Sequence, residues 1–196
     1  MDVTPQTIQR YDEQMSYKTE TATAALGCFW GPDAIFGGVD GIVKTRVGYA
    51  GGDVDNPQYH DLGTHTETIQ LEYDPAQWDF SDVIKRITRS MTLDRQPQMR
   101  QYHNILFYTD SREREIIQST IDSLSHETDD VIVRIEPIDT FYTAESYHQK
   151  YHLRTKRWAV DAFNQAGYDA EALRESPAAA VINSSLAGHT ESKLIG

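Results

Sequence analysis

The stretch TATAALGCFWG, residues 21–31, contains the change from strand to helix that decides the fold. Residues 21–26 alternate threonine with small apolar residues, which predicts a short strand. From Cys28 onward the apolar residues have helical spacing, and Pro32 suits the first helical turn because its missing N–H is not needed there. Gly37-Gly38 is typical of a helix end. The stretch therefore predicts a strand and a helix joined by a turn at Cys28.

The rest of the chain continues this alternation of short strands and amphipathic helices. The hydrophobic periodicity predicts strands at residues 42–49, 66–73, 104–108 and 131–138, helices at 81–91 and after Asp110, and a partly helical segment at 147–163. Residues 50–63 are dense in Gly, Asp, Asn and Pro and are predicted to form a long loop, a kind of segment that is often functional. We expect an α+β fold, a two-layer sandwich of helices on a mixed, mostly antiparallel sheet with a ferredoxin-like plait core.

The length of 196 residues, 39% of them hydrophobic, is sufficient for one hydrophobic core. The start of the chain is polar and has no clear period, and its end is rich in small residues. We therefore predict an N-terminal arm at residues 1–18, a catalytic domain at 19–163 and a loosely structured C-terminal tail at 164–196.

The charge of the chain argues against polyanionic partners. Its 18 basic and 30 acidic residues give a net charge of −12, so it lacks the positive surface that nucleic acids or anionic membranes attract. No apolar run approaches the ~18 residues of a membrane span, and the N-terminus has no basic segment followed by an apolar one. We expect a cytoplasmic protein without nucleic-acid or membrane partners. The acidity fits an ordinary solvated surface and equally a salt-adapted cytoplasm.

Cys28 is the only cysteine, which excludes an internal disulfide and a multi-cysteine zinc site. At a helix N-terminus the unpaired N–H groups and the helix dipole favour a thiolate, the reactive form of cysteine. The adjacent Phe29 and Trp30 can line a pocket for a sulfur-bearing group, because sulfur packs well against aromatic rings. Spacing alone favours the alternative that Phe29 and Trp30 are ordinary core aromatics.

Glu67 is the unusual residue of the predicted strand 66–73, since it lies on the apolar face with Ile69, Leu71 and Tyr73. Desolvation there raises the pKa of a carboxyl, which could then hold a proton near neutral pH. The alternative is an ion-paired strand residue.

The run GCFWG resembles the active-site motif of the peptide methionine sulfoxide reductase A family, and the resemblance covers about residues 20–155. Further matching segments follow in the family order: Gly48-Tyr49-Ala50-Gly51-Gly52, Asn56-Pro57, Tyr59, Gly63, His65-Thr66-Glu67, Tyr73-Asp74-Pro75, Gln101-Tyr102, Phe141-Tyr142, Ala144-Glu145 and Tyr147-His148-Gln149.

The resemblance implies that Cys28 attacks the sulfur of methionine sulfoxide and becomes a sulfenic acid as methionine leaves. Glu67 would protonate the sulfoxide oxygen, which is a poor leaving group until a general acid supplies a proton. Tyr59 and Tyr102 would donate hydrogen bonds to the same oxygen, as neutral donors can stabilise developing charge.

The resemblance also implies the substrate, the S epimer of free or peptide-bound methionine sulfoxide, with its methyl group held by Phe29 and Trp30. It implies no cofactor. Many relatives resolve the sulfenic acid with a second cysteine, which this chain lacks. An external reductant is therefore expected, either thioredoxin, a glutaredoxin-like protein or a low-molecular-weight thiol. We expect a monomer.

The sequence departs from the family pattern at four points. Pro97 stands where an aspartate is usual, with Asp94 close by in sequence, and Asp33 replaces a glutamate after GCFWG. His103-Asn104 replaces Arg-Ser, and the second cysteine is missing. These differences affect the expected rate more than the reaction type.

Two other functions use the same residues. Cys28 could be the nucleophile of a hydrolase with His60 or His65 as its base. Alternatively, the change at Pro97 could leave a non-catalytic binder of methionine sulfoxide or a redox sensor. A reductase consumes thiol as methionine forms, whereas a hydrolase does not, and a sensor stops after one methionine per chain.

Glu145, His148 and His152 have a spacing that could share one helix face and bind a metal. The order differs from the H-E-x-x-H of zinc proteases, and no paired carboxylates accompany it. We therefore expect no metal site here.

Overall fold

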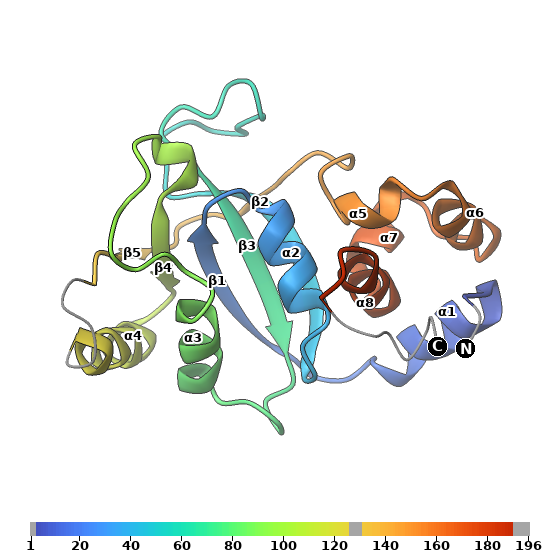
Figure 1. Ribbon diagram of the computed structural model, residues 1–196, viewed down its shortest axis with the longest axis horizontal. Helices are drawn as coiled ribbons and strands as arrows, with labels where there is room; N and C mark the ends of the chain where they lie inside the picture. Colours follow the sequence, from blue (N-terminus) through green and yellow to red (C-terminus); the bar gives the residue numbers. More distant parts are fainter. Residues whose placement is uncertain (1–2, 126–130, 190–196) are drawn as a thin grey trace.

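Six strands form one sheet in the order β5-β4-β1-β3-β2-β6 in the computed structural model, which describes residues 3–125 and 131–189 (Figure 1). The strands are β1 (Glu20–Leu26), β2 (Ile42–Ala50), β3 (Thr66–Tyr73), β4 (Asn104–Tyr108), β5 (Arg134–Pro137) and β6 (Tyr142–Thr143). Neighbouring strands are antiparallel except for β4 and β5, which are parallel. The mixed, mostly antiparallel sheet predicted from the sequence is confirmed.

The helices of the described residues are α1 (Pro5–Gln14), α2 (Trp30–Gly37), α3 (Phe80–Thr88), α4 (Ser111–Ser125), α5 (Tyr151–Arg154), α6 (Arg157–Gln165), α7 (Ala170–Glu175) and α8 (Pro177–Leu186), with a 3₁₀ turn η1 at Arg100–Tyr102. The segment from β1 to β4 has the order β-α-β-β-α-β and the strand order β4-β1-β3-β2, which is the ferredoxin-like arrangement that the sequence predicts. None of these helices is both long and apolar enough to cross a membrane.

The main core lies between the sheet and the helices α2 and α3. Strand β3 turns Ile69, Leu71 and Tyr73 toward this core and leaves each at most 1% exposed. Phe36 of α2 and Ile84 of α3 belong to the same cluster, so both helices cover one face of the sheet, as Figure 1 shows. Strand periodicity predicted this face correctly because one side of the strand is buried.

The two ends of the chain differ from their prediction. We expected residues 1–17 to have no clear period, yet α1 forms after Thr4, whose side chain accepts a hydrogen bond from the Thr7 N–H at 3.2 Å. Ile8, fully buried, anchors this helix in a second cluster with Phe163 of α6 and Ile182 of α8. One apolar residue on an otherwise polar helix is too weak a signal for sequence reasoning.

The expected loose structure of the C-terminal tail is wrong for α7 and α8. Helix α8 has the sequence PAAAVINSSL and is buried on nearly all sides. It therefore has no amphipathic stripe from which a helix could be predicted. Asp12 of α1 accepts hydrogen bonds from the Ala178 N–H and the Tyr168 hydroxyl, which joins the two ends of the chain. Residues 1–2 and 190–196 of the predicted arm and tail lie outside the described residues.

A buried ionic cluster fastens α2 to the sheet and to α8. Asp33 and Lys150, both fully buried, form an ion pair of 3.0 Å, and the Lys150 ammonium also donates to the Thr45 carbonyl at 2.6 Å. The Asn183 amide of α8 donates to the Asp33 carboxyl at 3.3 Å. Asp33, a departure from the family pattern, is therefore fully partnered.

We predict that Gly37→Ala destabilises the protein, because α2 and α8 touch at this glycine. A β-carbon at Gly37 would collide with the main-chain carbonyl of Ala180. Overpacking of this kind costs about 1–3 kcal/mol in unfolding free energy, measurable by urea denaturation. Gly31→Ala in the same helix is the control, since its β-carbon would meet no atom within 4 Å. Equal stability of the two variants would contradict the prediction.

Candidate active site

Cys28 lies in the turn between β1 and α2, as the sequence predicted. Gly27 has a φ of +79°, a left-handed conformation that glycine adopts without strain, and it reverses the chain directly before the cysteine. Cys28 is exposed, and its sulfur accepts a hydrogen bond from the Trp30 N–H at the start of α2. The thiol is therefore open to a substrate.

Glu67 lies directly beside this thiol. It is 1% exposed on β3, and its carboxyl lies close enough to the Cys28 side chain for each group to shift the pKa of the other. One carboxyl oxygen, Oε2, accepts the Phe29 N–H at 3.0 Å, and the other, Oε1, accepts the Gln101 amide at 2.7 Å. The structure therefore brings together the nucleophile and the acid that the sequence analysis named.

The environment of this pair favours protons on both groups. Burial raises the pKa of Glu67, although the hydrogen bonds from Phe29 and Gln101 oppose it. Desolvation, followed by the charge of Glu67, also raises the pKa of Cys28, and the hydrogen bond from Trp30 does not outweigh them. Our expectation that the helix N-terminus makes Cys28 a thiolate is thus wrong for the substrate-free protein. A proton on Glu67 would remove the repulsion.

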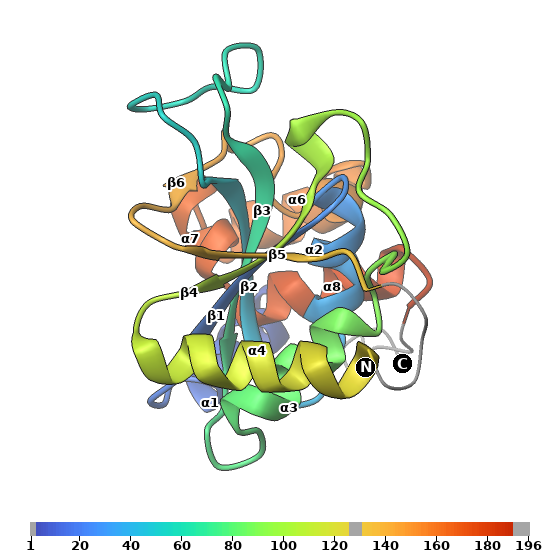
Figure 2. The ribbon, with the colours of Figure 1, turned by 90° about the vertical axis from the view of Figure 1, so that its left-hand side faces the viewer.

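Tyr59 lies in the loop between β2 and β3 and Tyr102 in η1 before β4, and both segments lie at the same end of the sheet (Figure 2). Tyr102 of η1 lies within the electrostatic reach of Tyr59, Glu67 and Cys28. Burial, followed by these neighbours, raises the pKa of Tyr102 to about 12, so its hydroxyl remains a neutral donor. The N–H of Tyr59 is held by Glu145 Oε1 at 3.0 Å.

Phe29 and Trp30 differ in exposure. Phe29 is 1% exposed and packs with its ring centroid 5.9 Å from Tyr49. Trp30 is half-buried and stacks on Tyr151, with the ring centroids 3.9 Å apart and the planes 10° from parallel. Trp30 is therefore the more accessible of these two aromatic side chains, and Phe29 is buried.

Several residues of the site were not assigned a role from the sequence. Gln101 holds Glu67, while Glu145 accepts hydrogen bonds from the Tyr49 hydroxyl at 2.8 Å and from Tyr59. His148, 2% exposed, accepts the indole N–H of Trp30 at 3.2 Å. Gln101, Glu145 and His148 lie in the segments that resemble the family, and this resemblance was the only indication in the sequence that they belong to the site. The contacts that each of them makes are visible only in the structure.

Among the described residues, neither His60 nor His65, the bases considered for a hydrolase, forms a hydrogen bond with Cys28. Both ring nitrogens of His65 are engaged within the loop, one accepting the Gly52 N–H at 3.1 Å and the other 2.8 Å from the Val54 carbonyl. His60 is exposed and contacts the edge of Tyr59. Asp94, considered as a substitute near Pro97, is also exposed. Within residues 3–125 and 131–189 no three His, Cys, Asp or Glu side chains form a potential metal site.

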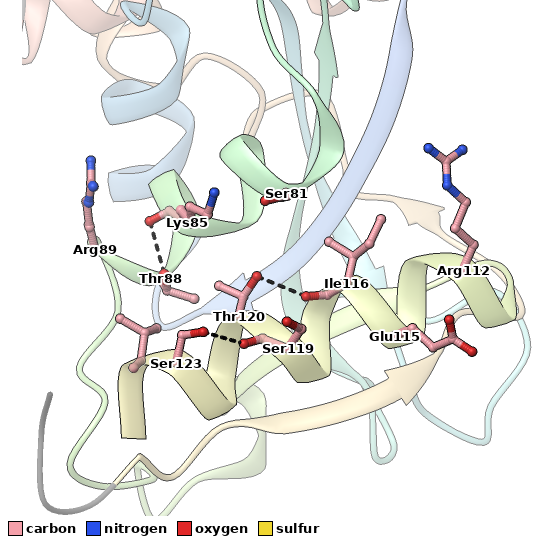
Figure 3. Close-up of a pocket in the computed structure, with 11 residues that line it drawn as sticks. Ser81, Lys85, Thr88, Arg89, Arg112, Glu115, Ile116, Ser119, Thr120 and Ser123 are labelled. Atoms are coloured by element: carbon pink, nitrogen blue, oxygen red, sulfur yellow. Dashed lines mark hydrogen bonds between the residues drawn. The ribbon is translucent and has the colours of Figure 1, made fainter. Parts of the chain in front are cut away.

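A groove of about 790 Å³ between α3 and α4 lacks the groups that this chemistry needs (Figure 3). Its lining contains Lys85, Arg112 and several hydroxyls, without cysteine or histidine. The hydroxyls of Thr88 and Thr120 donate to carbonyls of their own helices at 3.0 and 2.9 Å. The groove therefore lacks the thiol on which the expected chemistry depends.

Comparison with known proteins agrees with this geometry. The sequence profile of the family described as peptide methionine sulfoxide reductase matches residues 20–178. A peptide methionine sulfoxide reductase from Drosophila melanogaster is 32% identical over 171 residues, 86% of this chain and 68% of the relative. Peptide methionine sulfoxide reductase MsrA from Methanothermobacter thermautotrophicus is 40% identical over 144 residues, 67% of this chain and 85% of that protein.

Among solved structures, the reduced form of Mxr1 from Saccharomyces cerevisiae is similar, with a TM-score of 0.63 and 25% sequence identity over 71% of this chain and 87% of Mxr1. The profile match includes both Cys28 and Glu67, and it spans the sheet and the helices that hold them. Together, the fold, the paired thiol and carboxyl and these similarities show that the chain belongs to the peptide methionine sulfoxide reductase family.

Proposed function

We propose that this protein reduces methionine sulfoxide to methionine, with Cys28 as the nucleophile and Glu67 as the general acid. The observation that carries the proposal is the proximity of an exposed thiol to a carboxyl that is 1% exposed and that accepts the N–H of the next residue, Phe29, at 3.0 Å. A carboxyl whose pKa is raised by burial can hold the proton that a sulfoxide oxygen needs.

In the proposed reaction the Cys28 sulfur attacks the sulfur of the substrate while Glu67 gives its proton to the oxygen. This attack joins the two sulfur atoms. The protonated oxygen then moves to the Cys28 sulfur as the sulfur–sulfur bond and the sulfur–oxygen bond of the substrate break, so that Cys28 becomes a sulfenic acid and methionine leaves. The thiol proton restores the Glu67 carboxyl, so thiol plus sulfoxide becomes sulfenic acid plus thioether.

Four aromatic residues complete the proposed site. The hydroxyls of Tyr59 and Tyr102 hydrogen-bond the sulfoxide oxygen, and Trp30 above Phe29 receives the methyl group. The site would fix the methyl group and the oxygen in two different places. Only one configuration at the substrate sulfur can satisfy both, and we take it to be the S epimer. Both free and peptide-bound methionine sulfoxide fit this description.

An external thiol must close the cycle, because Cys28 is the only cysteine of the chain. Two thiol groups reduce the sulfenic acid to the Cys28 thiol, releasing water and forming one disulfide outside this chain. The similar yeast protein Mxr1 has been solved in complex with Trx2. We propose a thioredoxin-like protein or a small thiol as the reductant. A single exposed cysteine suits the reducing cytoplasm, and we propose a monomer there.

Turnover with dithiothreitol and methionine sulfoxide tests this function. We expect one methionine for each dithiothreitol oxidised, and without thiol a single burst of one methionine per chain that leaves Cys28 trappable as a sulfenic acid. A burst that does not continue when thiol is added would support a redox sensor instead. Cleavage of esters or amides without oxidation of thiol would support a hydrolase.

A further inference from the structure

A buried imidazole connects the proposed methyl pocket with the loop that carries Tyr59. His148 is 2% exposed, and its Nδ1 accepts the indole N–H of Trp30 at 3.2 Å. An indole can only donate, so Nδ1 must be unprotonated and the proton of a neutral His148 lies on Nε2. The rings of Phe29 and Tyr59 enclose the imidazole at centroid distances of 5.1 and 4.7 Å.

The other ring nitrogen points to a carboxylate. Nε2 of His148 is buried without a hydrogen-bond partner among the described residues, and Glu145 Oε2 lies 4.0 Å from it. Burial would raise the pKa of Glu145, but the hydrogen bonds from Tyr59 and Tyr49 outweigh this effect and lower it. Glu145 is thus a fixed negative charge that favours the Nε2–H tautomer.

The neutral form of His148 is the stable one. Burial lowers the pKa of His148, and the nearby His60 also lowers it, while Glu145 acts in the opposite direction. A neutral imidazole keeps Nδ1 free as an acceptor for Trp30 at neutral pH.

We propose that His148 is a positioning residue that holds the Trp30 indole in place, so that the methyl pocket exists before the substrate binds. Through Glu145, His148 is also linked to the backbone of Tyr59. This link fixes the position of Trp30 relative to the Tyr59 hydroxyl that would bind the oxygen. This inference rests on the proposed function, because the pocket belongs to the proposed site. Tyr151 stacks on one face of the Trp30 ring, and the hydrogen bond to His148 fixes the rotation of this ring.

Two variants distinguish the roles of the two ring nitrogens of His148. In His148→Asn the amide oxygen can replace Nδ1 as the acceptor for Trp30, whereas His148→Gln extends its amide toward the Nε2 position. We expect His148→Gln to raise KM for methionine sulfoxide about tenfold, the effect of one lost hydrogen bond, with kcat within about threefold of the wild type. His148→Asn should keep KM within about threefold. Equal KM values in the two variants would overturn the proposal.

The indole N–H itself gives a readout independent of activity. In protein labelled with ¹⁵N at tryptophan, the Trp30 resonance, assigned with Trp30→Phe, should show slow solvent exchange in the wild type and in His148→Asn and fast exchange in His148→Gln. The ¹⁵N shifts of His148 in the wild type should show an unprotonated Nδ1 and a protonated Nε2. The opposite tautomer would overturn the proposal even if neither variant folds.

These measurements distinguish a failure of this inference from a failure of the proposed function. A wild-type protein without turnover would refute the function, whereas the Trp30 and His148 resonances would still report the hydrogen bond. A lower kcat together with a higher KM in both variants, with lowered thermal stability, would indicate a merely structural histidine and contradict the positioning role.

Discussion

Glu67→Gln is expected to lower kcat by a factor of about 10² or more, as for the loss of a general acid. Glutamine fits the same space and keeps an acceptor for the Phe29 N–H, but it has no acidic proton for the sulfoxide oxygen. The change should also lower the pKa of Cys28, because the Glu67 carboxylate is one of the groups that raise it. The variant would thus be a poorer catalyst with a more acidic thiol.

Two measurements on Glu67→Gln check this prediction. Dithiothreitol-driven turnover gives kcat, and the pH dependence of Cys28 alkylation by iodoacetamide gives the thiol pKa. Glu72→Gln is the matched control, since it makes the same change on the same strand but on the opposite face, where Glu72 pairs with Arg46. A near-normal kcat in Glu67→Gln would show that Glu67 is not the general acid. An unchanged thiol pKa would contradict the electrostatic coupling.

Cys28→Ser is expected to abolish turnover entirely. A serine hydroxyl stays protonated at neutral pH, and oxygen cannot take up the substrate oxygen to form a sulfenic acid. The side chain is exposed and nearly isosteric, so unfolding by urea should have the same midpoint as in the wild type. Methionine released per chain should stay at the uncatalysed background, with or without thiol.

A retained burst of methionine in Cys28→Ser would mean that another group reduces the sulfoxide, and the mechanism would have to be abandoned. Tight binding of substrate by the inactive variant would be compatible with the proposal, since Trp30, Tyr59 and Tyr102 are unchanged. The wild type provides the positive control in the same assay.

The parts of the fold that the sequence predicted well are those with one buried face. The strands at 66–73 and 104–108 have the bounds of β3 and β4, and the helix after Cys28 ends at Gly37 as its glycines indicate. Hydrophobic alternation is a direct consequence of one-sided burial, so it can be read without a structure. The same reasoning correctly identified Glu67 as the exception on the apolar face of β3.

Other parts depend on contacts that no local pattern records. Helix α8 is buried on nearly all sides and Ile8 is the one buried residue of α1, so neither helix has a clear apolar stripe. The segment predicted as a strand at 131–138 forms β5 only at Arg134–Pro137. At the site, the raised pKa of Cys28 follows first from burial and then from a carboxyl thirty-nine positions away in sequence, neither of which the helix position alone could reveal.

The Asp33–Lys150 pair has a consequence for how this protein can evolve. Removal of one partner of a buried ion pair costs about 3–5 kcal/mol, a large part of the ~5–15 kcal/mol that stabilises a typical domain. A lineage that replaces Lys150 must therefore replace or re-partner Asp33 almost simultaneously, or acquire a stabilising change elsewhere first. We expect the two positions to covary among close descendants, and the history of the helix beside the catalytic turn to be tied to a residue more than a hundred positions downstream.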